Sequence, residues 1–325
     1  MIDHSYKKTL SDKDFRTSVG INRETFQEML KILSGAEKKK KARGGRPNKL
    51  PIESILLMAM HRFRHYTSLA SLASENSISK ATCCRNIKWV ENELVDHPLF
   101  SLPGKKVLEK NNPYYAVILI DSTETPIERP KKKIKNKKLV KNRNNQQKKF
   151  YSGKKKRHTI KTQVVVNEKT KEVICIKSTH GKCHDFTLLK NSKIKIDPSI
   201  KIITDSGYQG IKKLYENAEL PKKKSKKHPL TKEEKNKNRE ISRRRVVNEH
   251  VIGKLKRFKI IADRYRNKRT RFELRFNLIA GIYNLELKQS KTVPDIWPSV
   301  YLQESGLYGL LERENPMDYS IPMSA

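Results

Sequence analysis

The net charge of this chain sets the narrowest limit on what it can fold into. Of its 325 residues, 72 are Lys or Arg and 34 are Asp or Glu, which gives a formal net charge of +38 at pH 7. Self-repulsion on this scale disfavours a compact state unless a polyanion binds and offsets it. Only 35% of the residues are hydrophobic, and they occur in short blocks between basic runs. We therefore expect a nucleic-acid-binding protein whose core forms from short helices and strands.

Two other classes of protein receive little support. No apolar run reaches the roughly 20 residues of a membrane-spanning helix, and no signal peptide opens the chain, so we expect a cytoplasmic protein without a membrane partner. His180, Cys183 and His184 lie close together in the sequence but lack the second ligand pair of a typical zinc site. The simpler interpretation of the four cysteines is that they are reduced thiols.

The first 100 residues have the spacing of helices. Apolar residues recur at helical intervals over Ser11–Ser34 and again over Pro51–Phe63, so each segment is predicted to form one helix. A shorter helix at Thr67–Ala73, a turn at Glu75–Ile78 and a helix at Ser79–Val95 follow. This order is typical of a helix-turn-helix, which we place at about residues 67–95.

The second helix of this pair has side chains suited to DNA. Ser79 is expected to cap the helix by accepting a backbone N–H bond. The candidate DNA-binding residues beyond the cap are Lys80, Thr82, Arg85 and Lys88. Their side chains donate hydrogen bonds to phosphates and base edges. An ordinary helical hairpin has the same pattern, and the high positive charge favours the DNA-binding alternative.

From about residue 110 the pattern becomes that of an α/β fold. Tyr115–Ile120 is an apolar, β-rich run, predicted to be a buried strand that ends at Asp121. Further strands are predicted at Thr159–Val166, Val173–Ser178 and Ile200–Thr204, the last leading directly into Asp205. Helices are predicted near Asp185–Lys190, over about Lys232–Phe258, and over Leu274–Leu287. Between the first two strands, Arg129–Arg157 holds fifteen Lys or Arg and no acid, and is expected to be a basic arm or loop.

Three carboxylates in this region are candidates for catalysis. Asp121 and Asp205 follow two predicted strands, and the carboxyl ends of strands are where an α/β sheet exposes side chains to a ligand. Glu249 lies on the long predicted helix. Oxygen ligands of this kind suit Mg²⁺. Two such ions can hold the attacking and leaving oxygens of a phosphoryl transfer.

The spacing around Glu249 supports the assignment. The residues that share its helix face are Ser242, Arg245 and Lys256, and a separate apolar stripe comprises Val247, Val251, Leu255 and Phe258. The helix can therefore pack with one face and present charged groups on another. A solvated Arg–Glu pair on an exposed helix remains an alternative. His184–Asp185 is similarly open to two interpretations, a metal-binding pair or the first turn of a helix, and we prefer the second.

Several segments together resemble bacterial insertion-sequence transposases of the DDE class, in the insertion-sequence-five-like group. The segments that carry the resemblance are Ile120–Glu124, Tyr151–Lys156, His158–Gln163, Thr204–Gly210 and Asn248–Gly253. The resemblance covers about residues 46–287, and the ordered set is far more specific than any single acid.

The resemblance implies a ribonuclease-H-like mixed-sheet catalytic domain at residues 110–287, preceded by a helical DNA-binding region at residues 1–100. It implies Mg²⁺ or Mn²⁺, in two ions, held by Asp121, Asp205 and Glu249. It further implies cleavage at terminal inverted repeats and strand transfer by a freed 3′-hydroxyl, in a bacterial, nucleoid-associated protein. Double-stranded DNA is the implied partner, and pairing two transposon ends implies at least a homodimer. Lys154, Lys155, Lys156, Arg245 and Lys256 are the implied DNA contacts in this domain.

The sequence departs from the family pattern at three places. The related transposases carry a Tyr three residues before the Arg that corresponds to Arg245, and Ser242 stands there in this chain. The basic insert at Val140–Lys149 is longer than usual, and the tail at residues 288–325 has no counterpart. Two rival functions remain at this stage: a DNA-binding protein that lost catalysis, and a basic RNA- or ribosome-associated protein. Neither rival requires acids at two strand ends and on a helix.

Overall fold

The computed structural model describes residues 9–44, 48–131, 145–224 and 229–290. All of them belong to one compact unit, Met1–Ser290. Almost all of the tail expected at residues 288–325, and part of the insert expected at Val140–Lys149, lie outside the described residues.

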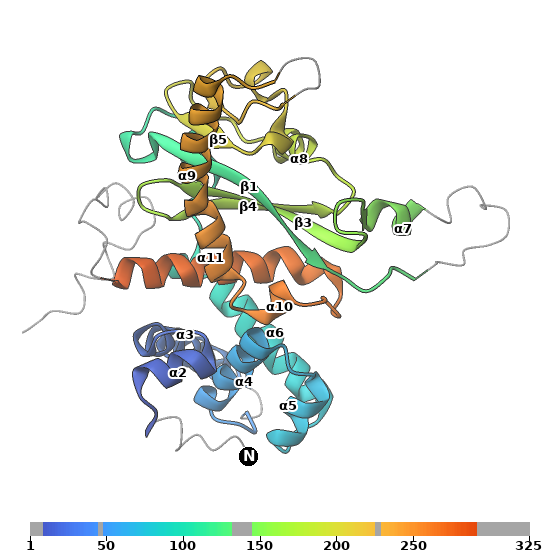
Figure 1. Cartoon of the computed structure of the whole chain (residues 1–325). Coiled ribbons are helices and arrows are strands. Elements are labelled where there is room, and N and C mark those ends of the chain that lie inside the picture. The colour runs from blue at the N-terminus through green and yellow to red at the C-terminus, as the bar shows by residue number, and fades with distance from the viewer. Residues whose placement is uncertain (1–8, 45–47, 132–144, 225–228, 291–325) are drawn as a thin grey trace, which may run out of the picture. The chain divides into compact units, whose positions relative to one another are not determined.

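A six-stranded mixed sheet forms the α/β part, as the sequence predicts (Figure 1). Its strands are β1 (Val117–Pro126), β2 (Tyr151–Ser152), β3 (Arg157–Asn167), β4 (Val173–His180), β5 (Lys201–Thr204) and β6 (Ala218–Glu219). The order is β2-β3-β1-β5-β6, and β4 also pairs with β3. β3 is antiparallel to β1, β2 and β4, whereas β5 is parallel to both β1 and β6.

The prediction that the first strand ends at Asp121 is wrong. Parallel pairing with β5 does stop there, since the last pair is Ile120 with Thr204. β1 nevertheless continues to Pro126, because antiparallel pairing with β3 runs on as far as Pro126 opposite Thr159. Asp121 therefore lies at the end of the parallel pairing but in the middle of a strand.

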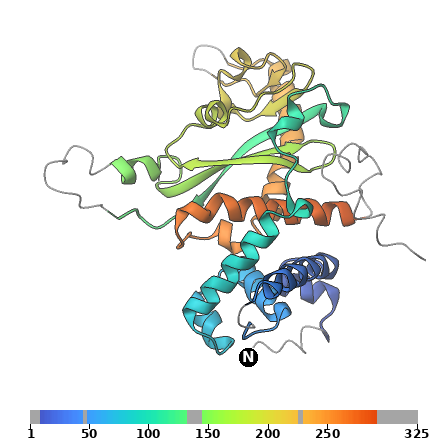
Figure 2. The ribbon, with the colours of Figure 1, turned by 180° about the vertical axis from the view of Figure 1, so that it is seen from behind.

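Helices cover both faces of the sheet (Figures 1 and 2). On one face, Ile118 and Ile120 pack with Leu189 of α8 (Asp185–Ser192) and with Tyr208. On the other face, Leu119 and Ile203 pack against Ile241 of α9 (Lys232–Leu255), the helix that crosses the sheet in Figure 1. The predicted helices at these positions are confirmed. Within the stretch expected to be a loop, α7 (Asn145–Phe150) and β2 form instead.

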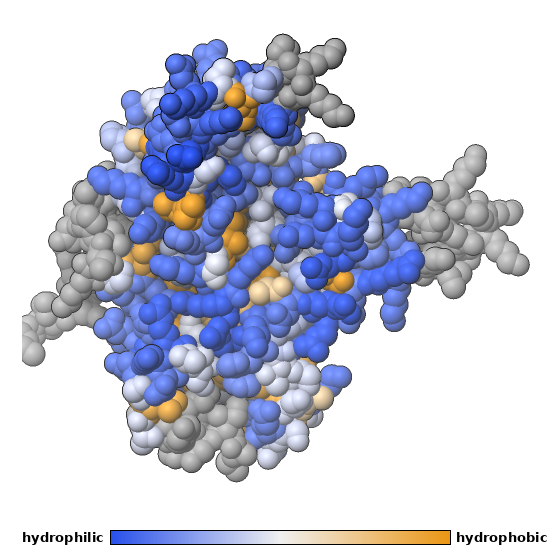
Figure 3. Space-filling model, viewed as in Figure 1, coloured by the Kyte–Doolittle hydropathy of each residue, from blue (hydrophilic) through white to orange (hydrophobic). Residues whose placement is uncertain are grey.

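Hydrophilic residues cover most of the face shown in Figure 3. Across the described ranges, none of the helices combines the length and apolar character that crossing a membrane requires.

The N-terminal region contains five α-helices within the described residues: α2 (Asp12–Val19), α3 (Arg23–Ala42), α4 (Ile52–His65), α5 (Leu69–Glu75) and α6 (Lys80–Val95). The prediction of a single helix over Ser11–Ser34 is wrong, because the first helix ends at Gly20 and a second begins at Arg23. Gly20 ends α2 with φ of 89°, and a Cβ there would lie 2.9 Å from the Phe258 ring. Only glycine adopts this conformation without strain. The predicted α4, α5 and α6 are confirmed, and the Ser79 hydroxyl caps α6 by accepting from the Thr82 N–H at 3.1 Å.

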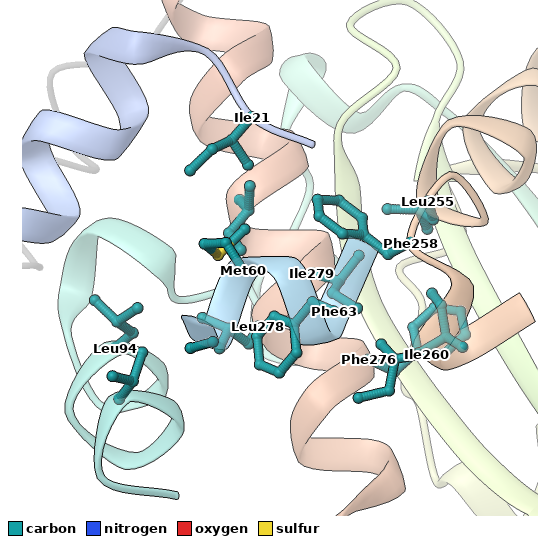
Figure 4. Packing of buried hydrophobic residues seen from close by; sticks show 14 of the residues in the cluster. Ile21, Met60, Phe63, Leu94, Leu255, Phe258, Ile260, Phe276, Leu278 and Ile279 are labelled. Carbon is teal, nitrogen blue, oxygen red and sulfur yellow. The ribbon is translucent and has the colours of Figure 1, made fainter. Parts of the chain in front are cut away.

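Helices from both ends of the described chain share one hydrophobic cluster (Figure 4). Met60 and Phe63 of α4 pack with Leu278 and Ile279 of α11 (Phe272–Gln289) and with Phe258, next to α10 (Lys259–Ala262). α11 is buried on nearly all sides, because it also packs against β4. This cluster joins the N-terminal helices to the layer beneath the sheet.

A buried ion network crosses the same boundary. Glu91 of α6 is fully buried, and its two oxygens accept from Arg271 at 2.7 Å and from Arg275 at 2.6 Å. Arg275 also donates to the Tyr265 hydroxyl at 2.7 Å. Each charged group in the network has an opposite charge in contact, which is the condition for burying such groups.

Candidate active site

Two aspartates stand side by side where β1 and β5 stop pairing. Ile120 pairs with Thr204, so the next residues along the two parallel strands are Asp121 and Asp205. The Asp205 carboxylate accepts from the Gly207 N–H at 2.8 Å and caps the short 3₁₀ helix Ser206–Tyr208. Asp121 accepts from the N–H of Ser122 at 2.7 Å. The acids that the sequence assigns to separate strands are thus neighbours in the fold.

Helix α9 brings Arg245 and Glu249 to the same place. An Arg245 Nη2 lies 3.7 Å from Asp121 Oδ2 and 4.0 Å from Glu249 Oε1. The Glu249 side chain is 61% exposed, whereas that of Asp121 is 16% exposed. The predicted helix face is correct for this pair, since one guanidinium reaches both carboxylates. Ser242 is exposed on the same helix.

The environment of Asp121 opposes its ionisation. Burial, with smaller contributions from the nearby carboxylates of Asp205 and Asp185, raises the pKa of Asp121 to about 6 against the lowering effects of the Ser122 N–H and of Arg245. Within the described ranges, no three acidic, His or Cys side chains gather closely enough to enclose a metal ion. The donor set still fits a hard divalent cation, because it consists of carboxylate oxygens whose mutual repulsion such a cation would offset.

Asp185 is a member of this cluster that the sequence reasoning missed. It begins α8, as predicted, but its carboxylate faces the sheet. Its Oδ1 accepts from the Ser122 hydroxyl at 2.6 Å and forms an ion pair with Lys161 Nζ at 2.9 Å. The one available signal was the pair His184–Asp185, which the first-turn interpretation fully explained. Only the fold shows that the first turn of α8 faces β1.

Lys161 is nearly buried between two acids. Its Nζ lies 3.8 Å from a Glu124 oxygen and donates to the Cys183 carbonyl at 2.7 Å, in addition to its contact with Asp185. Glu124 also accepts from the Thr159 hydroxyl at 2.8 Å. Side chains alternate across a strand, so Ser122 and Glu124 point to the face opposite that of Asp121.

A pocket of about 820 Å³ opens beside these groups. Glu124, Lys161 and Asp185 line it together with cationic residues of the β2–β3 hairpin and neighbouring loops. The cationic residues are Arg129, Lys148, Lys154 and Lys182. The pocket therefore combines cationic side chains with the carboxylates of Glu124 and Asp185.

The predicted DNA-binding lysines of the sheet region separate into two groups. Lys154, Lys155 and Lys156 are all exposed on the hairpin between β2 and β3. Lys256 is partly buried and follows the last residue of α9. Burial and the nearby Lys155 lower the pKa of Lys256, while Glu124 raises it. Lys256 is thus placed near Lys155 and Glu124, whereas Arg245 contacts Asp121 and Glu249.

The candidates on α6 belong to a different surface. Lys80, Arg85 and Lys88 are exposed, as a DNA-contacting helix requires. Thr82 is partly buried, and its hydroxyl is hydrogen-bonded to Ser79 at 2.9 Å and accepts from Arg85 at 3.2 Å. Thr82 therefore serves the N-cap in this structure.

Comparison with known proteins agrees with this geometry. Residues 120–284 match the model of the family described as DDE superfamily endonuclease. The matched segment contains Asp121, Asp205, Glu249 and Arg245. The chain belongs to the DDE superfamily endonucleases.

This DDE endonuclease has a curated relative of nearly the same length. It is 44% identical over 280 residues to the probable transposase for insertion sequence element IS702 of Microchaete diplosiphon. The alignment covers 86% of this chain and 96% of the relative. No solved structure matches the chain significantly. The resemblance to DDE transposases drawn from the sequence motifs is confirmed: the chain is a transposase homologue with an enzymatic endonuclease domain. The insertion-sequence-five-like group stays a prediction.

Proposed function

We propose that this DDE endonuclease is the transposase of a bacterial insertion sequence, acting at the terminal inverted repeats of its element. It would cleave DNA there and join the freed 3′-hydroxyl to a target. The observation that carries the proposal is the meeting of Asp121, Asp205, Arg245 and Glu249 at one end of the sheet, in a chain 44% identical to a probable insertion-sequence transposase.

Asp121, Asp205 and Glu249 are the proposed catalytic and metal-binding residues. Members of this superfamily generally use divalent metal ions, and we propose two Mg²⁺ or Mn²⁺ ions here. When bound, such ions supply Lewis-acid stabilisation of the oxygens that attack and leave phosphorus. The carboxylates would provide the negative charge that holds the ions, and Asp121 must lose its proton to do so.

Arg245 has a positioning role in this proposal. Its guanidinium lies between Asp121 and Glu249, so it holds the α9 acid beside the strand acid. It also lowers the pKa of Asp121, which favours the ionised form that a cation requires. A DNA phosphate arriving at the site would accept hydrogen bonds from its guanidinium.

The DNA would be double-stranded and would follow two basic surfaces. One is the hairpin with Lys154–Lys156, next to the basic pocket and near Lys256. The other is the outer side of α6, with Lys80, Arg85 and Lys88, in a helix-turn-helix formed by α5 and α6. Lysine and arginine at these places bind the phosphate backbone by releasing its counterions.

The proposed domain organisation assigns DNA recognition and catalysis to different parts of the chain. We propose a DNA-end-recognising region at residues 1–100 and a ribonuclease-H-like catalytic domain at residues 110–287. The mixed sheet, with acids on neighbouring strands where the parallel pairing of β1 and β5 stops, supports the second assignment. Two copies, each holding one transposon end, would act together in the bacterial nucleoid.

The test is cleavage of a labelled duplex that carries the terminal repeat, with Mg²⁺ or with EDTA. The wild type should cut at the repeat boundary only with Mg²⁺, whereas Asp121→Asn and Glu249→Gln should bind the duplex without cutting it. Glu240→Gln is the matched control, because Glu240 is an exposed acid on the same helix. If Glu249→Gln cuts as fast as Glu240→Gln, the assignment of the third acid is wrong.

A further inference from the structure

Asp185 is held more firmly than an acid at a helix start needs to be. Such an acid interacts favourably with the helix dipole while remaining in water. The Asp185 side chain is instead 21% exposed. One of its oxygens, Oδ1, accepts a hydrogen bond from Ser122 and forms an ion pair with Lys161. These two partners lie on β1 and β3, so the sheet fixes the orientation of a carboxylate that belongs to α8.

The second oxygen of Asp185 lies near Asp205, the residue that follows β5. A Cβ built on Gly207 would lie 2.7 Å from Asp185 Oδ2 and 2.9 Å from Asp205 Oδ1. The two carboxylates therefore approach each other across Gly207, where only a glycine leaves room. Asp205 in turn lies beside Asp121, because these two residues directly follow the last paired residues of β1 and β5, Ile120 and Thr204. Carboxylates from β1, the end of β5 and the start of α8 are thus neighbours in the fold.

A buried hydroxyl points to the same place. Tyr208 is fully buried close to Ser122, and its hydroxyl oxygen makes no hydrogen bond of good geometry in the described part of the chain. Burial and the carboxylates of Asp185, Asp121 and Asp205 raise the pKa of Tyr208 well above its ordinary value. A buried donor without a hydrogen bond of good geometry thus lies near these acids, which is an arrangement that functional sites tolerate more often than structural cores.

The alternative explanation for Asp185 is a purely structural role, which is to neutralise Lys161. A buried ammonium needs an opposite charge, and Asp185 supplies one. Glu124, however, also faces Lys161, at 3.8 Å, and it points away from Asp121 along the strand. If neutralising Lys161 were the whole role of Asp185, the two acids would be equivalent. Only Asp185 extends a free oxygen toward Asp205.

We propose that Asp185 is a fourth carboxylate of the cation site, oriented by Lys161 and Ser122 so that its free oxygen binds the divalent ion together with Asp121 and Asp205. The inference rests on the proposed metal-dependent function and adds a ligand to it. Like charges repel one another, and a divalent ion would draw the carboxylates together. Glu249, which is more exposed, would complete the site from α9.

The test compares Mn²⁺ binding to the full-length wild type, Asp185→Asn and Glu124→Gln, measured by electron paramagnetic resonance without DNA. Asp185→Asn preserves shape and can still accept the Ser122 hydrogen bond. It should weaken Mn²⁺ binding by at least about tenfold, the lower end of the effect expected even for groups that only support a ligand. Glu124→Gln removes the other partner of Lys161 and should leave Mn²⁺ binding within about twofold of wild type.

The outcomes separate this inference from the proposed function. Equal Mn²⁺ binding by Asp185→Asn and wild type, with binding lost in Asp121→Asn, would overturn the role of Asp185 while leaving the enzyme assignment intact. Equal weakening by Asp185→Asn and Glu124→Gln would show that Asp185 only balances Lys161. Absence of Mn²⁺ binding by the wild type would contradict the metal-dependent function itself.

A measurement on the unmodified protein covers the case in which Asp185→Asn does not fold. Fe²⁺ substituted into the site, with ascorbate and peroxide, cleaves the backbone near its ligands. Fragments should end near residues 121, 185 and 205. Fragments at residues 121 and 205 alone would overturn the proposal.

Discussion

We expect the buried charge of Asp121 to lower the free energy of unfolding of the protein when no cation is bound. The substitution Asp121→Asn should therefore make the protein more stable while abolishing cleavage. The pKa of Asp121 rises from the usual 3.8 to about 6, mainly because burial disfavours the charged form. A rise of this size corresponds to about 3 kcal/mol, since each tenfold change in acid strength is worth about 1.4 kcal/mol. The side chain is 16% exposed, so solvent screens only part of this effect.

The pH dependence has a definite sign. A carboxyl group whose pKa is higher in the folded state binds its proton more tightly there, so folding is favoured as the pH falls. Below about pH 4, Asp121 is protonated in both states and costs nothing. The cost grows between about pH 4 and pH 6 and is complete at pH 7. Asp121→Asn lacks an ionisable group and should show none of this variation.

The assay is urea unfolding of both proteins in EDTA, at pH 7.5 and at pH 4.5. At pH 7.5 the Asp121→Asn protein should be more stable by about 2–3 kcal/mol, and the difference should shrink at pH 4.5. Mg²⁺ should stabilise the wild type and not the variant, because a ligand stabilises only the state that binds it.

Asp197→Asn serves as a control of the opposite sign. Hydrogen bonds from the Ser199 hydroxyl and N–H lower the pKa of Asp197, so neutralising this acid should not stabilise the protein at pH 7.5. An Asp121→Asn protein that is less stable than wild type, by an amount independent of pH, would refute the reasoning. It would mean that Arg245 outweighs the cost of burying the charge.

Three further predictions concern single features of the fold. Glu91→Ala leaves two arginines without their buried carboxylate and should lower the free energy of unfolding by about 3–5 kcal/mol, measured by urea denaturation; a loss below about 1 kcal/mol would show that water replaces the carboxylate. Arg245→Met removes a charge that lowers the pKa of Asp121, so the pH midpoint of Mn²⁺ binding should move upward, and a downward move would contradict the contact. Changing Lys154–Lys156 to Gln should weaken binding to all DNA sequences alike. The slope of log K against log salt should become shallower by the amount expected for about three lost phosphate contacts, and filter binding from about 50 to 200 mM salt would measure it. An unchanged slope would exclude these lysines from the DNA interface.

Local patterns in the sequence determined most of the individual elements. The apolar run before Asp121, the alternation in β3 and β4, and the helical spacing of α4 and α11 depend only on neighbouring residues, so they could be recognised without the fold. The same holds for the Ser79 cap, whose partner lies three residues away. Arg245 and Glu249 were placed on one helix face for the same reason, because helix geometry fixes which residues are neighbours.

Features that depend on distant partners could not be recognised in this way. The break at Gly20 is imposed in part by the Phe258 ring, which is far away in the sequence. The extension of β1 beyond Asp121 exists because β3 supplies hydrogen-bond partners for it.

The candidate active site shows most clearly the difference between what local sequence patterns indicate and what depends on contacts between distant residues. The sequence alone predicted DNA binding and the three candidate carboxylates, because composition and motif order carry that information directly. The tertiary structure decided that Asp185 joins them, since this depends on Ser122 and Lys161 from two other strands. A carboxylate at the start of a helix has the same local sequence whether it faces water or a buried lysine, and only the packing of α8 against the sheet distinguishes the two.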